Sequence, residues 1–182
     1  MRKVRIQSIT NMLTMFTLGI ALASTAQSLQ AQTFTTLYSF TGGTDGAAPF
    51  AGVIQDRQGN LYGMTNTGGT GLFGNPFGSG TVFKLDTNGN ETVLHSFGET
   101  VTDGEFPFTG NLLLDHEGNL YGTTEFGGAY ASGTVFRLSS NGKEAVFSFP
   151  GGSKGGFPYA GLVPDGAGNV YGTTYARGSG CL

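Results

Sequence analysis

Short apolar runs separated by turn-forming residues dominate the chain beyond its first 31 residues. In one such run Thr81, Phe83 and Leu85 alternate with Val82 and Lys84, and a period of two is typical of a β-strand. We expect one face of this strand to be buried, and we predict that Phe83 and its counterpart Phe136 in the second unit lie in the core. Beyond the N-terminal segment no stretch shows the 3.6-residue apolar period of a helix, so the pattern predicts an all-β protein.

The runs belong to an internal repeat. The sequence GNLYG occurs at Gly59–Gly63 and again at Gly118–Gly122, and GNVYG follows at Gly168–Gly172. A Pro-Phe or Pro-Tyr pair precedes each copy, and after the first two copies Gly-Thr-Val-Phe and Ser-Phe follow in the same order. An isolated Ser39-Phe40 precedes the first unit. A repeat of about 50 residues indicates a modular array.

We predict four short strands in each complete unit. In the first and second units we expect them at 51–55, 61–65, 81–85 and 92–97, and at 112–114, 120–124, 133–138 and 145–149. The third unit offers only 162–163 and 170–174. The first two strands of each unit are joined by Asp-x-x-Gly-Asn, a hairpin turn in which the aspartate (Asp56, Asp115 or Asp165) can bind the amides of the turn.

Four antiparallel strands per unit are typical of a β-propeller blade. A parallel β-helix or a β-sandwich is the alternative, but a β-helix has shorter periods and a sandwich has no reason to repeat its turns. We therefore predict a propeller-like array of about two and a half blades at 32–182, with units near 41–97, 98–149 and a truncated 150–182. Since a closed ring takes about four blades or more, we expect a fragment of a longer protein.

The N-terminal segment 1–31 resembles a secretory signal peptide with a helical core. Arg2, Lys3 and Arg5 precede an uncharged apolar run at 12–23, and small residues follow it. The run is shorter than the roughly 20 residues that span a bilayer. We expect cleavage after Ala26 or Ala31, a secreted or cell-surface location, and no stable membrane span after cleavage.

The ordered motifs from Leu37 onwards resemble the GloVer tandem repeat of exported bacterial "choice-of-anchor" proteins. The shared elements are Asp-x-x-Gly-Asn-Leu-Tyr-Gly-Thr-Thr, Gly-Gly, Gly-Thr-Val-Phe-Lys-Leu and Ser-Phe. The first of these is also similar, more loosely, to blades of NHL and streptogramin-lyase-like propellers. The resemblance implies an exported or surface-bound repeat protein with propeller-like blades, and it implies no particular enzymatic activity.

Composition narrows the classes of partner. Glycine makes up 33 of 182 residues, but without the three-residue period of collagen. Without the three basic residues of the leader, six Lys and Arg stand against 12 Asp and Glu, a net charge near −6. Nucleic acid is therefore a poor partner, because it selects a basic surface. The single cysteine, Cys181, allows no intramolecular disulfide and no cysteine-based metal cage.

No residues form a convincing catalytic, cofactor or metal site in the sequence. His95 and His116 stand alone, and a metal site needs several converging ligands. The stretch 86–90 faintly resembles a calcium loop but lacks its closing glutamate, so a hairpin turn is the better interpretation. Asp56, Asp115 and Asp165 recur as turn formers do. We expect no cofactor.

The function favoured by this sequence is a non-enzymatic interaction scaffold for a glycan or a protein. Four loop aromatics could stack on sugar rings or, as the more conservative interpretation, seal neighbouring blades: Phe73, Phe77, Phe126 and Tyr130. The alternatives are a propeller enzyme of the lyase or lactonase kind and a truncated fragment without independent function. Open blade edges should also favour self-association.

Overall fold

The structure is a computed structural model that describes residues 34–71, 76–142 and 144–178. The chain separates into two units, Met1–Thr35 and Thr36–Leu182, and the second contains all the described strands. The predicted signal peptide and its cleavage sites lie outside the described residues, as do Phe73 and Cys181.

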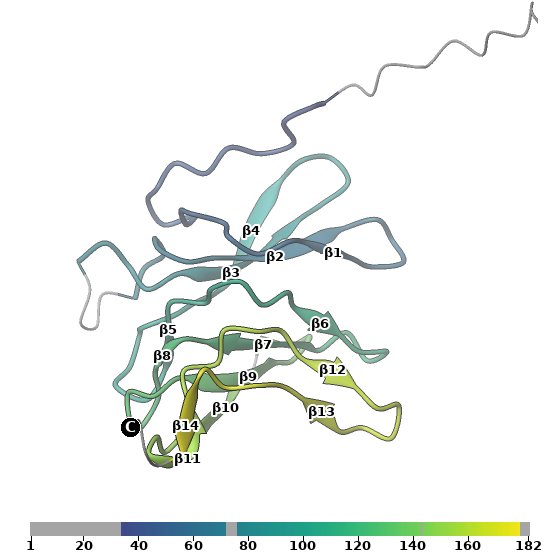
Figure 1. Ribbon diagram of the computed structural model, residues 1–182. Coiled ribbons are helices and arrows are strands. Elements are labelled where there is room, and N and C mark those ends of the chain that lie inside the picture. The colour runs from purple at the N-terminus through teal and green to yellow at the C-terminus, as the bar shows by residue number, and fades with distance from the viewer. Residues whose placement is uncertain (1–33, 72–75, 143, 179–182) are drawn as a thin grey trace, which may run out of the picture. The chain divides into compact units, whose positions relative to one another are not determined.

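Two four-stranded antiparallel sheets form the main part of the second unit (Figure 1). Blade 1 has the order β1 (Ile54–Gln55), β2 (Leu61–Thr65), β3 (Thr81–Leu85) and β4 (Glu91–Ser96). Blade 2 has the order β6 (Leu113–Leu114), β7 (Leu120–Thr124), β9 (Thr134–Leu138) and β10 (Glu144–Ser148). The described residues contain no helix, and therefore none long and apolar enough to cross a membrane.

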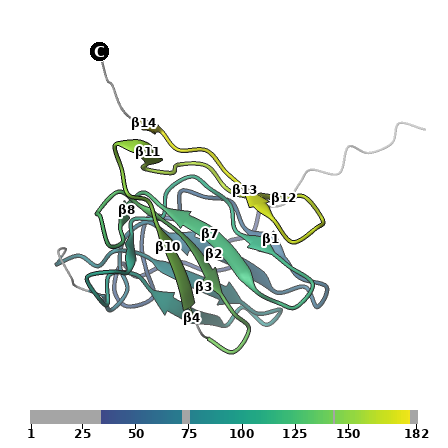
Figure 2. The same cartoon turned by 90° about the horizontal axis from the view of Figure 1, so that it is seen from below.

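Shorter pairs complete the described strands. A third hairpin, β12 (Val163–Pro164) with β13 (Val170–Tyr171), repeats the first two strands of a blade. The two remaining pairs are β5 (Gly104–Glu105) with β8 (Phe126–Gly127), and β11 (Ser153–Gly156) with β14 (Ala176–Gly178). In Figure 1 the third hairpin lies below the two larger sheets, and Figure 2 shows it beside the pair of β11 and β14. The predicted all-β array of four-stranded antiparallel blades, about two and a half in number, is confirmed.

The first strand of each blade is shorter than the sequence predicts. The run expected at 51–55 is paired with β2 only at Ile54 and Gln55. Before it, the amide of Gly52 donates to Oδ1 of Asn111 in the next repeat, at 2.9 Å. This amide is therefore used to join two repeats rather than to extend the sheet.

Both faces of β3 are buried, so the prediction of a single buried face is wrong. The predicted burial of Phe83 and Phe136 is confirmed, at 6% and 1% exposed. Val82, on the face opposite Phe83, also has no solvent-accessible surface. The reason is the stacking of the repeats, because a strand inside an array has a neighbouring layer on each side. Val82 joins the cluster between the blades, whereas Phe83 contacts Phe40 from the segment before blade 1.

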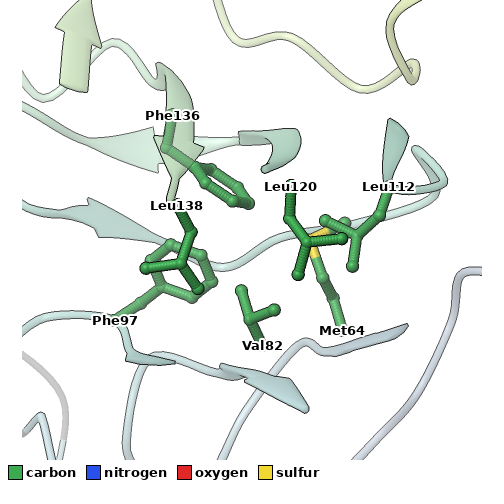
Figure 3. Packing of buried hydrophobic residues seen from close by; sticks show 7 residues of the cluster. All are labelled: Met64, Val82, Phe97, Leu112, Leu120, Phe136 and Leu138. Carbon is green, nitrogen blue, oxygen red and sulfur yellow. The ribbon is translucent and has the colours of Figure 1, made fainter. Parts of the chain in front are cut away.

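The core lies between blade 1 and blade 2 and takes side chains from both (Figure 3). Its buried members are Met64, Val82, Phe97, Leu112, Leu120, Phe136 and Leu138. The rings of Phe97 and Phe136 meet edge to face with centroids 5.1 Å apart. Phe40 and Phe83 repeat this contact at 4.9 Å. The Phe of the first two Ser-Phe motifs therefore covers the third-strand Phe of the following blade.

This packing explains the last glycine of GNLYG. A Cβ at Gly122 would lie 2.6 Å from Cζ of Phe136, and a Cβ at Gly63 would lie 2.6 Å from Cζ of Phe83. Both distances are far below van der Waals contact. The glycine therefore leaves the space that the buried ring of the neighbouring strand occupies.

A backbone latch joins successive repeats at the residue before the proline that leads into each GNLYG or GNVYG motif. Ala48, Phe106 and Phe157 occupy this position and have φ of 53°, 56° and 57°. This left-handed conformation costs a non-glycine residue about 1–2 kcal/mol. The amide of Phe106 donates to the carbonyl of Ser79 in the preceding repeat at 2.9 Å, and its carbonyl accepts from Glu125 at 3.1 Å. These two bonds hold the strained residue between blades.

Candidate functional site

Three ionisable side chains from different elements meet where blade 1 joins blade 2. His95 is in β4, Asp103 precedes β5, and Glu144 begins β10. His95 Nε2 lies 3.3 Å from Oδ1 of Asp103 and 3.5 Å from Oε1 of Glu144. The side chains are only 15%, 4% and 19% exposed, respectively. We call this group the second junction, because the preceding repeat boundary carries an equivalent group.

Asp103 is fixed by backbone donors. Its Oδ1 accepts from the amide of Gly104 at 2.7 Å, and its Oδ2 accepts from the amide of Glu99 at 3.1 Å. The imidazole of His95 packs edge to face on Phe97, with centroids 4.8 Å apart. Since Phe97 is part of the core, the junction is anchored to the packing between the blades.

The electrostatics of the second junction shift two pKa values. Burial raises the pKa of Glu144 to about 7; the charge of His95 opposes this shift, and the carboxylates of Asp103 and Glu99 add to it. Burial alone would lower the pKa of His95, but the hydrogen bond to Asp103 and the surrounding carboxylates raise it overall. The negative charges gathered here therefore favour a cation beside them.

One oxygen of the junction lacks a donor. Oε1 of Glu144 is enclosed by protein and accepts no hydrogen bond from any residue that the structure describes. The single proton that His95 Nε2 can carry cannot be directed at both carboxylates at once. With Asp103 nearer, Glu144 is left without a donor in a place where burying a charged oxygen is costly.

The preceding repeat boundary carries an equivalent group, the first junction, made of Tyr38, Asp45 and Glu91. Tyr38 and His95 each stand two residues before the Phe of a Ser-Phe motif. Glu91 faces Leu85 in the register of blade 1 as Glu144 faces Leu138 in blade 2. The hydroxyl of Tyr38 donates to Oδ2 of Asp45 at 3.1 Å, and Oε1 of Glu91 is again buried without a donor from the described part of the chain.

The next repeat departs from this pattern. Phe147 stands at the position of Tyr38 and His95, two residues before Phe149. Lys154 stands three residues before the latch residue Phe157, where Asp103 stands three residues before Phe106. The array therefore presents a tyrosine, a histidine and a phenylalanine at one equivalent position, and only the histidine is a strong metal ligand.

A polar pocket of about 540 Å³ opens beside both junctions. Its lining includes Asp45 and Glu91 of the first junction, and His95 of the second with the neighbouring Glu99. Burial raises the pKa of Glu91, and the nearby Asp45 carboxylate adds to the shift. The pocket thus gives solvent and solutes access to a set of carboxylates around one imidazole.

The sequence interpretation considered His95 as an isolated residue and so missed this convergence. The signal that was present is the repeat itself, since aligning Tyr38, His95 and Phe147 identifies a variable position within a constant motif. His116 is exposed in the turn between β6 and β7 and joins no metal-ligating cluster of the described residues.

The stretch 86–90 is organised as a hairpin turn. Oδ1 of Asp86 accepts from the amides of Asn88 and Asn90, both within 2.9 Å, and Oδ2 accepts from Nδ2 of Asn90 at 2.9 Å. Asp56, Asp115 and Asp165 make the same contacts in their own turns, each with one additional tyrosine hydroxyl donor. These aspartates therefore shape turns.

A second feature is a continuous row of aromatic rings that crosses the repeats, formed by Phe50, Phe108, Tyr159 and Tyr175. Neighbouring centroids lie 5.4, 5.5 and 5.1 Å apart, all edge to face. Phe50 is 57% exposed and Tyr175 77% exposed, while the two inner rings are half-buried. Three of the rings come from the Pro-Phe and Pro-Tyr pairs, one per repeat, whereas Tyr175 follows the GNVYGTT motif and extends the row at its end.

The loop aromatics singled out in the sequence divide between the two interpretations. Phe126 contacts Phe106 and Phe157, with centroids 6.2 and 5.5 Å away, and so connects neighbouring units, although it is still 39% exposed. Phe77 and Tyr130 are 78% and 60% exposed. None of these three rings belongs to the aromatic row.

Comparison with known families identifies the repeat. The model of the Gloeobacter/Verrucomicrobia repeat matches residues 23–181, which is most of the chain. The chain therefore belongs to this family, and the resemblance to the GloVer repeat is confirmed. No curated protein matches the chain.

Proposed function

We propose that this member of the Gloeobacter/Verrucomicrobia repeat family is an exported, non-enzymatic scaffold that binds glycan chains along its aromatic row. The observation that carries the proposal is the row itself. Phe50, Phe108, Tyr159 and Tyr175 form a line of rings with exposed ends, and the first three of them stand at one repeated sequence position. Aromatic rings usually find an apolar partner, and a line of them suits an extended ligand.

The chemistry of the row favours a glycan over an apolar peptide. The C–H faces of sugar rings pack on aromatic rings, while their hydroxyls need polar neighbours. Such groups flank the row: the hydroxyl of Tyr159 donates to Glu125 at 2.8 Å, and Thr109 is exposed beside it with its hydroxyl on the carbonyl of Tyr159. The net negative charge of the chain argues for a neutral or basic glycan rather than an acidic one.

Export is supported by the basic start, apolar run and small residues of the N-terminal segment. Mass spectrometry of protein recovered outside the cytoplasm should find a new N-terminus after Ala26 or Ala31. An intact Met1 on protein confined to the cytoplasm would contradict this part of the proposal.

The binding proposal is tested on the full chain with a panel of soluble neutral, basic and acidic polysaccharides, using affinity electrophoresis and calorimetry. Phe50→Ala and Tyr175→Ala should each weaken binding at least about tenfold, the effect of losing about 1.4 kcal/mol of contact. Phe147→Ala is the matched control, because Phe147 is 59% exposed but stands in β10, outside the row.

Three outcomes would contradict the proposal. The first is that no polysaccharide binds, and the second is that the Phe147 variant loses as much affinity as the row variants. The third is shortening of a bound polysaccharide, which would favour the lyase-like alternative and refute the non-enzymatic assignment.

A further inference from the structure

We infer that the second junction is a binding site for a divalent metal ion of zinc-like ligand preference, held by His95, Asp103 and Glu144. This site is separate from the aromatic row, and the inference does not depend on glycan binding. One ligand atom from each of the three side chains lies within 4.8 Å of the other two.

The distances agree with a tetrahedral site. Nitrogen and oxygen ligands bound to zinc at about 2.0–2.1 Å stand about 3.3–3.4 Å apart at the corners of a tetrahedron. His95 Nε2 lies 3.3 Å from Asp103 Oδ1 and 3.5 Å from Glu144 Oε1. The two distances from His95 Nε2 therefore already have the required length. The third distance, between the oxygens of Asp103 and Glu144, needs only an adjustment of the carboxylates.

An unpartnered carboxylate oxygen beside an imidazole nitrogen points to a cation. Oε1 of Glu144 is enclosed and receives no donor from the described residues, and His95 Nε2 lies 3.5 Å from it. Oε1 of Glu91 in the first junction is likewise unpartnered, but there a tyrosine takes the place of the nitrogen ligand. A neutral imidazole lone pair and two carboxylate oxygens can all bind one metal ion, whereas one N–H cannot serve both oxygens. A metal ion would thus satisfy every member of the group at once.

The donor set selects the class of metal. Imidazole with carboxylate oxygen suits zinc and related transition ions, while calcium takes six to eight oxygen ligands. Three protein ligands leave a fourth position, and the polar pocket that His95 and Glu99 line gives access to it. A water molecule can complete the coordination from there.

The repeat provides an internal comparison. The first junction keeps both carboxylates but has Tyr38 where the second has His95. A phenol that donates to Asp45 is enough for a structural junction, so the same fold is stable without an imidazole at this position. The replacement of tyrosine by histidine changes the group from a hydrogen-bonded junction to a ligand set.

The experiment uses the full chain freed of metal by a chelator and then titrated with zinc chloride in calorimetry, with metal content measured after dialysis. The wild-type chain should bind one zinc ion and unfold at a higher temperature with zinc. His95→Tyr installs the residue of the first junction and should weaken zinc binding more than about 100-fold, beyond the effect of changes outside the ligand set.

Two controls and a second variant complete the test. Glu91→Gln alters the equivalent glutamate of the first junction, and His116→Ala removes the other histidine; both should keep full affinity. Glu144→Gln should lose affinity like His95→Tyr, which keeps the test decisive if the tyrosine variant does not fold. The inference is overturned by a wild-type chain without stoichiometric zinc, by unchanged binding in Glu144→Gln, or by equal losses in the two controls.

Discussion

Phe136 is the residue at which the stacking of blades can be tested most directly. Its ring is 1% exposed, belongs to the cluster between the blades and meets Phe97 at 5.1 Å. Burying such a side chain contributes about 1.5–3 kcal/mol, and an edge-to-face pair adds about 0.5–1.5 kcal/mol. Phe136→Ala should therefore lower the free energy of unfolding by about 3–5 kcal/mol, the usual range for emptying a buried aromatic site.

The assay is urea unfolding of the full chain followed by circular dichroism. Phe147→Ala serves as the comparison, since Phe147 is 59% exposed and its truncation should change stability by no more than about 0.5 kcal/mol. Phe136→Leu, which keeps most of the volume, should cost less than about 1.5 kcal/mol and remains measurable if the alanine variant unfolds. Equal midpoints for Phe136→Ala and Phe147→Ala would refute the assignment of the core to the space between the blades.

Four further predictions follow from the same packing and turns. Phe83→Ala should cost about 3–5 kcal/mol in the same urea assay, and a cost below 1 kcal/mol would contradict its contact with Phe40. Gly122→Ala should destabilise by more than about 1 kcal/mol because its Cβ would meet Phe136, and an unchanged midpoint would show that the ring can move. Burial raises the pKa of Asp115, but hydrogen bonds from Asn119 and the turn outweigh burial and lower it overall. The Asp115 carboxylate therefore stabilises the fold above its unfolded pKa of about 3.9, and this contribution is lost as the pH falls through the lower folded value. Asp115→Asn should flatten the acid limb of a plot of stability against pH. Phe147 and Val163, both exposed, should drive self-association as concentration rises, and a monomer by light scattering at every concentration would contradict this.

The sequence predicts the blades well because the information for them is local. The ranges of β2, β3 and β7 agree with the alternation and with their flanking turns, which are set by Asp, Gly and Asn within a few residues. The prediction that only one face of β3 is buried was wrong because it used local information alone. Alternation shows that two faces differ, but Val82 is buried by a blade about 50 residues away, which no local pattern reveals.

The second junction could not be predicted from spacing. His95 and Glu144 are separated by almost a full repeat. They meet only because β4, which contains His95, and β10, which contains Glu144, belong to stacked blades. The aromatic row is an intermediate case. Its repeated Pro-Phe and Pro-Tyr pairs are visible in the sequence, but their alignment into one row depends on the spacing of the blades.

The contact between each Ser-Phe motif and the next blade sets an order for folding during synthesis. Phe40 covers Phe83, and Phe97 covers Phe136, so each blade receives its closing ring from a segment nearer the N-terminus. Translation delivers that segment first. A newly made blade can therefore complete its packing as soon as it emerges, on a surface that already exists, and it need not wait for residues that have not yet been translated.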